Sequence, residues 1–408
     1  MTKADTFSLA PGFTATATAC GLKPNGALDM ALITADAPCS AAGLFTTNRV
    51  KAAPVIYDQH VLATNAGSIR AVVINAGNAN ACTGPQGAAN CRAMAEMTAE
   101  RLGCRADQVL VLSTGVIGRQ LDMTKVAQGI AALTGPTAHQ GAGAAARAIM
   151  TTDTRPKVAA RTISVAGKTV TIAGMCKGAG MIHPSMATML AVVTTDAQAS
   201  PAILDRALRY AADRSFNRVS VDGDTSTNDT LLLLASGASG VPVSETAAPG
   251  NLSFDEFATT LTEVCIDLAK QIARDGEGAT RLVEITVSGA QDEQQAHQVA
   301  NAIARSPLVK TAIHGGDPNW GRIVCAAGYS GAAINPDRLA LWFGPASSPL
   351  QLVANGLPLD ADLAAASALL RQDPVFITLD LGLGTAHTTV WTCDFSKEYI
   401  EINAHYTT

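Results

Sequence analysis

Aromatic and charged side chains are scarce in this sequence, and both shortages exclude kinds of function. Phe, Trp and Tyr make up only 4% of the residues, too few for the aromatic platforms on which single-stranded nucleic acids stack. Asp, Glu, Lys and Arg make up 15%, and the formal net charge is −5. A nucleic-acid surface needs a basic face, so no nucleic-acid partner is expected.

Long apolar runs and paired cysteines are also missing. The longest apolar candidates, such as residues 231–235, are far shorter than the roughly 18 to 20 residues that span a bilayer, and residues 1–13 contain no apolar signal core. The nine cysteines form no C-x-x-C pair, which indicates buried thiols rather than disulfides or a metal site. We therefore expect a cytoplasmic protein with no metal and no membrane partner.

Apolar residues, by contrast, are plentiful, and their patterns predict a mixed fold. They make up 48% of 408 residues, enough for a large core and two or three domains or subdomains. A short apolar strand at 71–75 precedes an amphipathic helix at 86–102. Runs rich in β-branched residues at 161–165 and 169–175 predict a hairpin. Hairpins among helices favour an α+β fold over a purely parallel α/β sheet.

Further helices and two boundaries follow from the same patterns. Helices are predicted at 122–133, 139–151, 201–213 and 254–274. Two prolines and several small polar residues predict a linker at 241–250. A second boundary is predicted near 276–280, and the alternation of strands and helices resumes after it.

Residues 177–190, K-G-A-G-M-I-H-P-S-M-A-T-M-L, are the most informative stretch of the chain. Small and turn-forming residues lead to Ala187 and Thr188, and an apolar run follows, which predicts a loop that leads into a buried strand. By spacing alone, Thr188 is an ordinary β-branched residue at the start of a strand. If the bond before it broke, however, Thr188 would carry a hydroxyl nucleophile and an amine base on one residue.

Together with this stretch, segments along the whole chain resemble the ornithine acetyltransferase family, also called the ArgJ family, the glutamate N-acetyltransferases of arginine biosynthesis. The matching segments occur in the family's order, at 12–13, 45–48, 52–55, 75–80, 113–118, 150–157, 177–190, 221–229, 275–281, 316–322 and 402–403. So many specific segments in order make a chance match very improbable.

The resemblance implies a fold and a cleavage. The expected fold is α+β, an αββα sandwich of the DmpA/ArgJ-like type with a smaller C-terminal α+β subdomain at about 282–408. The expected cleavage falls between Ala187 and Thr188. It would leave an α fragment, 1–187, and a β fragment, 188–408, which associate as an α2β2 heterotetramer.

The resemblance also implies a ping-pong acetyl transfer. Thr188 would take the acetyl group from N2-acetyl-L-ornithine, with its own α-amine as the base, and pass it to L-glutamate. Such an amine has a reference pKa of about 7.7 to 8.0 and is partly neutral near pH 7. Thr114 and Gly115 would form the oxyanion hole. No cofactor is implied, although some members of the family also use acetyl-CoA as a donor, which makes it an additional candidate substrate.

Substrate contacts carried over in the same way fall at six positions: Thr151, Lys177, Thr188, Glu277, Asn403 and Thr408. Lys177 would pair with an α-carboxylate, and Glu277 would meet the side-chain ammonium of ornithine. The polar segment 222–229 is expected to satisfy loop backbone groups around the site.

Two alternatives remain open from the residues. One is a self-processing aminopeptidase or amidase of the same fold, in which water replaces glutamate as the acceptor. The other is a binding protein that keeps the fold and never cleaves. The acetylated product separates the first alternative from acetyl transfer, and an intact chain without transfer would indicate the second.

Overall fold

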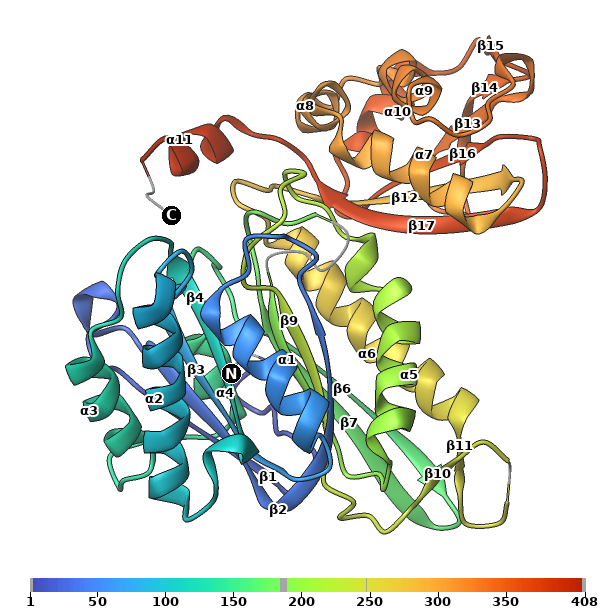
Figure 1. The fold of residues 1–408 in the computed structure, drawn as a ribbon. Coiled ribbons are helices and arrows are strands. Elements are labelled where there is room, and N and C mark those ends of the chain that lie inside the picture. Colours follow the sequence, from blue (N-terminus) through green and yellow to red (C-terminus); the bar gives the residue numbers. More distant parts are fainter. Residues whose placement is uncertain (1–2, 184–188, 247, 406–408) are drawn as a thin grey trace.

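The computed structural model describes residues 3–183, 189–246 and 248–405, and its main body is a layered sandwich (Figure 1). A nine-stranded mixed sheet runs in the order β4-β3-β2-β9-β8-β7-β6, with β1 on β2 and β5 on β1. Its strands are β1 (Phe13–Thr18), β2 (Met30–Phe45), β3 (Ile69–Asn78), β4 (Val109–Val116), β5 (His139–Gln140), β6 (Lys157–Val165), β7 (Lys168–Lys177), β8 (Leu190–Thr195) and β9 (Thr230–Ala235).

The helices of the main body lie on both outer faces of the sheet. They are α1 (Ala53–Asn65), α2 (Gly84–Leu102), α3 (Met123–Leu133), α5 (Pro201–Asp213) and α6 (Phe254–Arg274). The exception is α4 (Ala142–Ala148), which belongs to the central core. Short 3-10 turns lie at Pro24–Gly26, Ala106–Gln108, Phe216–Arg218 and Pro336–Arg338. In Figure 1, α2 and α3 cover one side of the sandwich, and α5 and α6 cover the other.

The long strand β2 joins two half-sheets that share one core. Its first part pairs with β1 and β3, and its second part, residues 40–45, pairs with β9. Alternate side chains of the strands then face different layers. Leu190 and Val192 of β8 join Val72 and Ile74 of β3 in the central core, which also includes α4. The predicted αββα arrangement is thereby confirmed.

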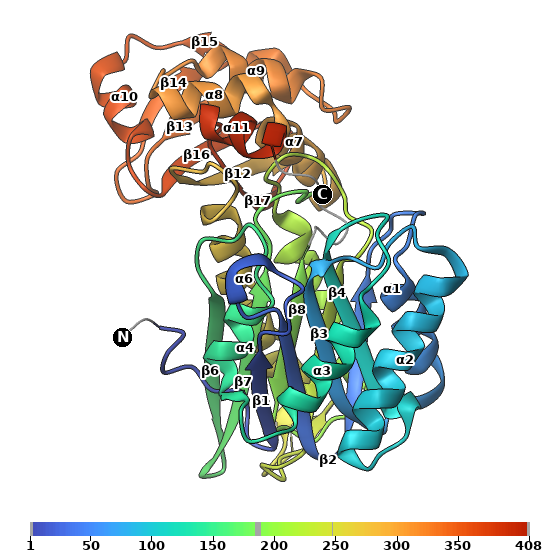
Figure 2. The same cartoon turned by 90° about the vertical axis from the view of Figure 1, so that its left-hand side faces the viewer.

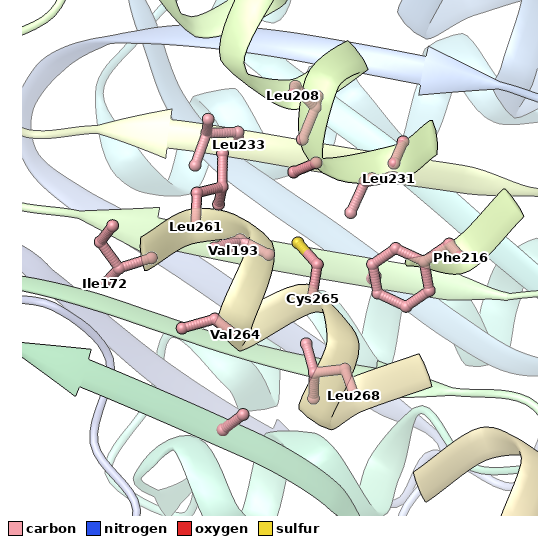
Figure 3. Packing of buried hydrophobic residues seen from close by; sticks show 14 of the residues in the cluster. Ile172, Val193, Leu208, Phe216, Leu231, Leu233, Leu261, Val264, Cys265 and Leu268 are labelled. Carbon is pink, nitrogen blue, oxygen red and sulfur yellow. The ribbon is translucent and has the colours of Figure 1, made fainter. Parts of the chain in front are cut away.

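The outer layers bury the opposite faces of the same strands. Ala191 and Val193 of β8 pack with Leu261 and Leu268 of α6, as Figure 3 shows for Val193 and both leucines. Ser253 begins α6 by accepting a hydrogen bond from the Glu256 N–H, a normal N-cap. The predicted helices at 201–213 and 254–274 match α5 and α6 at both ends.

Two predictions about the main body are wrong. The helix expected at 139–151 is only α4, because Gly141 has a φ of +99° and residues 139–140 pair with β1 as a short strand instead. The linker expected at 241–250 does not separate domains. Its strand β10 (Val243–Ser244) pairs with β11 (Leu252–Ser253), and both Val243 and Leu252 are buried in the core under α5 and α6.

A second, smaller sheet follows the main body, in the order β15-β14-β13-β16-β12-β17. Its strands are β12 (Leu282–Ala290), β13 (Ala340–Phe343), β14 (Leu350–Ala354), β15 (Leu357–Pro358), β16 (Val375–Asp380) and β17 (Ala386–Cys393). Its helices are α7 (Glu293–Arg305), α8 (Pro307–Gly315), α9 (Trp320–Gly328) and α10 (Leu363–Leu370). This C-terminal subdomain has its own apolar core.

The last helix, α11 (Lys397–His405), leaves the C-terminal subdomain. Figure 1 shows it beside that subdomain and over the end of the main body, and Figure 2 shows it from another side. None of its residues is buried, although the ring of Tyr399 stacks on that of Phe395. Across the described parts of the chain, no helix is both long and apolar enough to cross a membrane.

Candidate active site

A small cavity of about 130 Å³ lies where α11 meets the end of the main body. This is below the roughly 300–1,000 Å³ of pockets for drug-sized ligands, and it suits a small metabolite. Residues from widely separated segments line it: Ala79, Thr114, Gly115, Ile117, Thr151, Thr152, Lys177, Gly180, Met181, Asp222, Asp224, Ser226, Thr227, Asn228, Glu277, Tyr399 and Asn403.

The structure thus brings six of the residues predicted for the site to one cavity. They are Thr114, Gly115, Thr151, Lys177, Glu277 and Asn403. The other three predicted positions, Ala187, Thr188 and Thr408, lie outside the described residues.

One wall of the cavity is neutral and is built at the end of β4. Gly115 has a φ of +132°, and a Cβ added there would lie 2.3 Å from the carbonyl carbon of Gly77 on the neighbouring strand. Only glycine fits so close an approach. The register between β3 and β4 shifts at this point, and the shift leaves Thr114 and the Gly115 backbone on the cavity wall.

Amide side chains hold this neutral wall in place. Asn228 donates from Nδ2 to the carbonyl oxygens of Ala79 at 2.6 Å and Ser113 at 2.8 Å. The Ser113 hydroxyl donates to Asn75 Oδ1 at 2.6 Å. Asn228 comes from the polar segment 222–229, and it ties the loop after β3 to the end of β4. Because every partner is uncharged, the position of this wall depends on hydrogen bonding and shape.

Another part of the cavity wall, the charged wall, carries buried charge, beginning with Lys177 at the end of β7. Lys177 is only 3% exposed, and its ammonium lies 4.0 Å from Asp153 Oδ2. Burial lowers the pKa of Lys177, and the neighbouring Asp153 carboxylate opposes that shift. Among the described residues, Lys177 Nζ donates no hydrogen bond, so it can still pair with the carboxylate of a small ligand.

A buried ion network supports Lys177 from behind. Lys157 Nζ lies 2.6 Å from Asp153 Oδ1 and 2.5 Å from Asp275 Oδ2. Burial alone would raise the pKa of Asp153, but the ammonium groups of Lys157 and Lys177 hold it well below its usual range. Asp153 also accepts hydrogen bonds from the N–H groups of Thr151 at 3.0 Å and Gly178 at 2.7 Å. The Asp153 carboxylate therefore fixes the backbone at both Thr151 and Gly178.

Glu277 faces the cavity from the loop after α6. It is 8% exposed, and its N–H donates to the Ala179 carbonyl at 2.8 Å. A Cβ on Gly180 would lie 2.4 Å from the Glu277 carboxyl group, so a larger residue at 180 would displace that carboxylate. Asn403 of α11 donates from Nδ2 to Glu277 Oε2 at 2.8 Å. This contact brings the end of the chain to the site.

Sequence reasoning gave no role to Asp153, Lys157 and Asp275, and it gave Asp222 only a general one. Asp222 accepts hydrogen bonds from the N–H groups of Met181 at 2.6 Å and Ile182 at 2.9 Å, and burial raises its pKa. It therefore holds the chain just before the predicted cleavage point. The sequence could have pointed to these four residues, because all of them fall within segments that match the family.

The described residues contain no group of three or more His, Cys, Asp or Glu side chains arranged to bind a metal ion. The cavity offers instead several hydroxyl groups, the backbone of Gly115, the ammonium of Lys177 and three carboxyl groups, those of Asp222, Asp224 and Glu277. These groups suit a small ligand that carries both a carboxylate and an ammonium.

Comparisons with known proteins agree in covering nearly the whole chain. The model of the ArgJ family matches residues 14–408. Arginine biosynthesis bifunctional protein ArgJ of Symbiobacterium thermophilum is 49% identical over 399 residues, which is 97% of each chain. The protein of that name from Geobacter sulfurreducens is 48% identical over 398 residues, 97% of this chain and 99% of that one.

A solved structure is also similar in part. The crystal structure of arginine biosynthesis bifunctional protein ArgJ from Bacillus halodurans is 44% identical, with a TM-score of 0.49, and covers 53% of this chain and 98% of that chain. The whole-chain family match and the relatives of near-equal length confirm the resemblance seen in the sequence. The chain belongs to the ArgJ family.

Proposed function

We propose that the chain is an acyltransferase of arginine biosynthesis that moves an acetyl group from N2-acetyl-L-ornithine to L-glutamate by a ping-pong mechanism. One observation carries the proposal. Thr114 and Gly115 on the neutral wall face the same cavity as Lys177 and Glu277 on the charged wall. Family membership supports the pathway, because the relatives are named for arginine biosynthesis.

The proposed nucleophile, Thr188, is created by self-cleavage after Ala187. Its hydroxyl attacks the Ala187 carbonyl, the peptide becomes an ester as the amine leaves, and water hydrolyses the ester to release the α fragment's carboxylate. The geometry around the cleavage point supports this step. Gly180 and Met181 line the cavity, and Leu190, two residues after Thr188, pairs with Lys177.

In the transfer reaction, Thr188 attacks the acetyl carbonyl while its own amine accepts the hydroxyl proton. Thr114 and Gly115 stabilise the oxyanion, and ornithine leaves. The amine of glutamate then attacks the acetyl ester and regenerates the Thr188 hydroxyl. No metal ion or organic cofactor takes part. Acetyl-CoA is a proposed second donor, since the relatives are described as bifunctional.

Substrate binding divides between two of the charged groups that line the cavity. Lys177 pairs with the α-carboxylate that both amino acids carry, and Glu277 pairs with the side-chain ammonium of ornithine. Thr151 and Asn403 supply neutral polar contacts from the cavity wall, and Thr408 is proposed as a further contact. The α and β fragments stay together, because β7 and β8 are adjacent strands of one sheet, and they are proposed to assemble as α2β2.

Replacing Thr188 tests the proposal directly. Intact mass spectrometry of the purified wild type should show two fragments, the second beginning at Thr188, whereas Thr188→Ala should remain one chain and transfer no acetyl group. The assay should give N-acetylglutamate from N2-acetyl-L-ornithine only when glutamate is present. Release of acetate without glutamate dependence would indicate an amidase instead, and a wild-type fragment that begins elsewhere would refute the assignment of the nucleophile.

A further inference from the structure

We infer that Asp229 is a positioning residue for the nucleophile, acting through the backbone of Met189, the residue that follows Thr188. The inference rests on the proposed function and adds a residue to it. Asp229 ends the segment 222–229 and directly precedes β9, which runs parallel to β8 with Leu190 opposite Thr230. The side chain therefore lies beside the start of β8.

Both backbone polar groups of Met189 are held from this neighbouring strand. Its N–H donates to Asp229 Oδ1 at 3.2 Å, and its carbonyl accepts from the Thr230 N–H at 3.0 Å. Chain ends are ordinarily poorly ordered unless something ties them down. After cleavage, Thr188 would be such an end, with its Cα only about 3.8 Å from that of Met189. Fixing the Met189 peptide therefore limits where the nucleophile can go.

The position of Asp229 is itself well fixed. Its side chain is fully buried, and its carbonyl accepts a hydrogen bond from the Thr46 N–H at 3.0 Å. On the other side of β8, Lys177 pairs with Leu190. The start of β8 thus lies between a lysine that faces the cavity and a buried aspartate, and the hydrogen bond to Asp229 fixes the Met189 backbone on the β9 side.

A hydrogen-bond acceptor, rather than a negative charge, is what this role needs. Burial raises the pKa of Asp229 well above its ordinary value, although the Met189 N–H and the Lys177 ammonium oppose the shift. Within the described parts of the chain, the buried Asp229 Oδ2 forms no hydrogen bond, although the hydroxyl groups of Ser226 and Thr46 also oppose the rise in pKa. Asparagine has nearly the same shape and retains the acceptor, so it should replace Asp229 in this task.

The chain contains a matched control in Asp58 of α1. Asp58 is also fully buried and its Oδ1 accepts the backbone N–H of Val111 at 2.8 Å, while its Oδ2 has no hydrogen-bond partner among the residues that the structure describes. Burial raises its pKa in the same way. Asp58 does not line the cavity. Removing either carboxyl group therefore takes away a similar buried contact, but only Asp229 touches the residue after the nucleophile.

The test compares Asp229→Ala, Asp229→Asn and Asp58→Ala with the wild type. The cleaved fraction is followed by intact mass spectrometry after cell-free synthesis, and kcat and KM for acetyl transfer are measured on the cleaved protein. Asp229→Ala should slow cleavage and lower kcat by roughly 10- to 100-fold, since small misplacements of reacting groups have effects of this size. Its KM should stay near the wild-type value. Asp229→Asn and Asp58→Ala should cleave and turn over nearly as the wild type does.

Two outcomes would overturn the inference while leaving the proposed function intact. Equal slowing by Asp229→Ala and Asp58→Ala would show a loss of stability alone, and equal loss in Asp229→Asn and Asp229→Ala would show that the ionisable carboxyl group itself is required. If Asp229→Ala does not fold, hydrogen exchange of the Met189 amide in the wild type still tests the inference. If the Met189 amide exchanges as fast as exposed amides, Asp229 does not hold Met189 and the inference is refuted. A Met189 amide that is protected from exchange would support it. A wild type that never cleaves would refute the proposed function instead.

Discussion

The two walls of the cavity are stabilised by different physical effects. The neutral wall, at the end of β4, is set by a glycine that no larger residue can replace and by amide hydrogen bonds from Asn228. The charged wall depends on Lys157, which is buried between two carboxylates behind Lys177. A shape-determined wall should lose function when a single methyl group is added. A charge-determined wall should lose stability when one ion is removed.

The largest expected effect on turnover is on the neutral wall, in Gly115→Ala. The new Cβ would collide with the Gly77 backbone at 2.3 Å, in a backbone conformation that disfavours alanine. The wall must then shift, and kcat should fall by about 10²–10³-fold, as it does when an oxyanion donor is lost. Steady-state kinetics on the cleaved enzyme measures this. In the control, Gly67→Ala, the added Cβ meets no described atom within 4 Å, and a similar loss there would refute the steric argument.

The next effect concerns the charged wall, in Lys157→Met. Methionine fills much of the same space but leaves Asp153 and Asp275 buried without their shared cation. Breaking such a buried pair costs about 3–5 kcal/mol, so the free energy of unfolding should drop by that amount in chemical denaturation. The exposed pair Arg209–Asp205 is the control, because Arg209→Met should cost less than about 1 kcal/mol. If the two variants lost equal stability, burial would not be what makes the network important.

The smallest of the three effects should be on substrate choice, in Glu277→Gln. The amide oxygen can still accept the hydrogen bond from Asn403, so the wall should keep its shape and lose only a charge. A hydrogen bond to a charged group contributes about 1.5–3 kcal/mol, so KM for N2-acetyl-L-ornithine should rise roughly 10- to 100-fold. KM for glutamate should change much less. An equal rise in both values would show that Glu277 does not select the ornithine side chain.

Local signals predicted much of the fold. Apolar periodicity places α5 and α6 correctly, and the runs rich in β-branched residues place β6 and β7. β2 was not predicted, because its 16 residues include Asp36 and Pro38 and show no clean alternation. Nor was α11 predicted, since it has no buried face and therefore no apolar stripe.

The residues of the site likewise divide into those that the sequence predicted and those that only the structure revealed. The resemblance named six described residues that the structure brings to one cavity. It gave no role to Lys157, because a buried lysine and a solvated one look identical in sequence, and lysines are almost never fully buried unless paired. The network becomes visible only when Asp153 and Asp275, 122 positions apart in the numbering, meet at one ammonium group.

By itself, the sequence determined the family, the positions of several helices and strands and the threonine on which the proposed chemistry depends. These are properties of local periodicity and of ordered motifs, which need no spatial information. Only the tertiary structure decided that α11 returns to the cavity, that Lys157 is buried between two carboxylates and that Asp229 holds Met189. Burial, ion pairing and hydrogen bonding between distant segments arise from how the strands and helices pack, and no single segment contains that information.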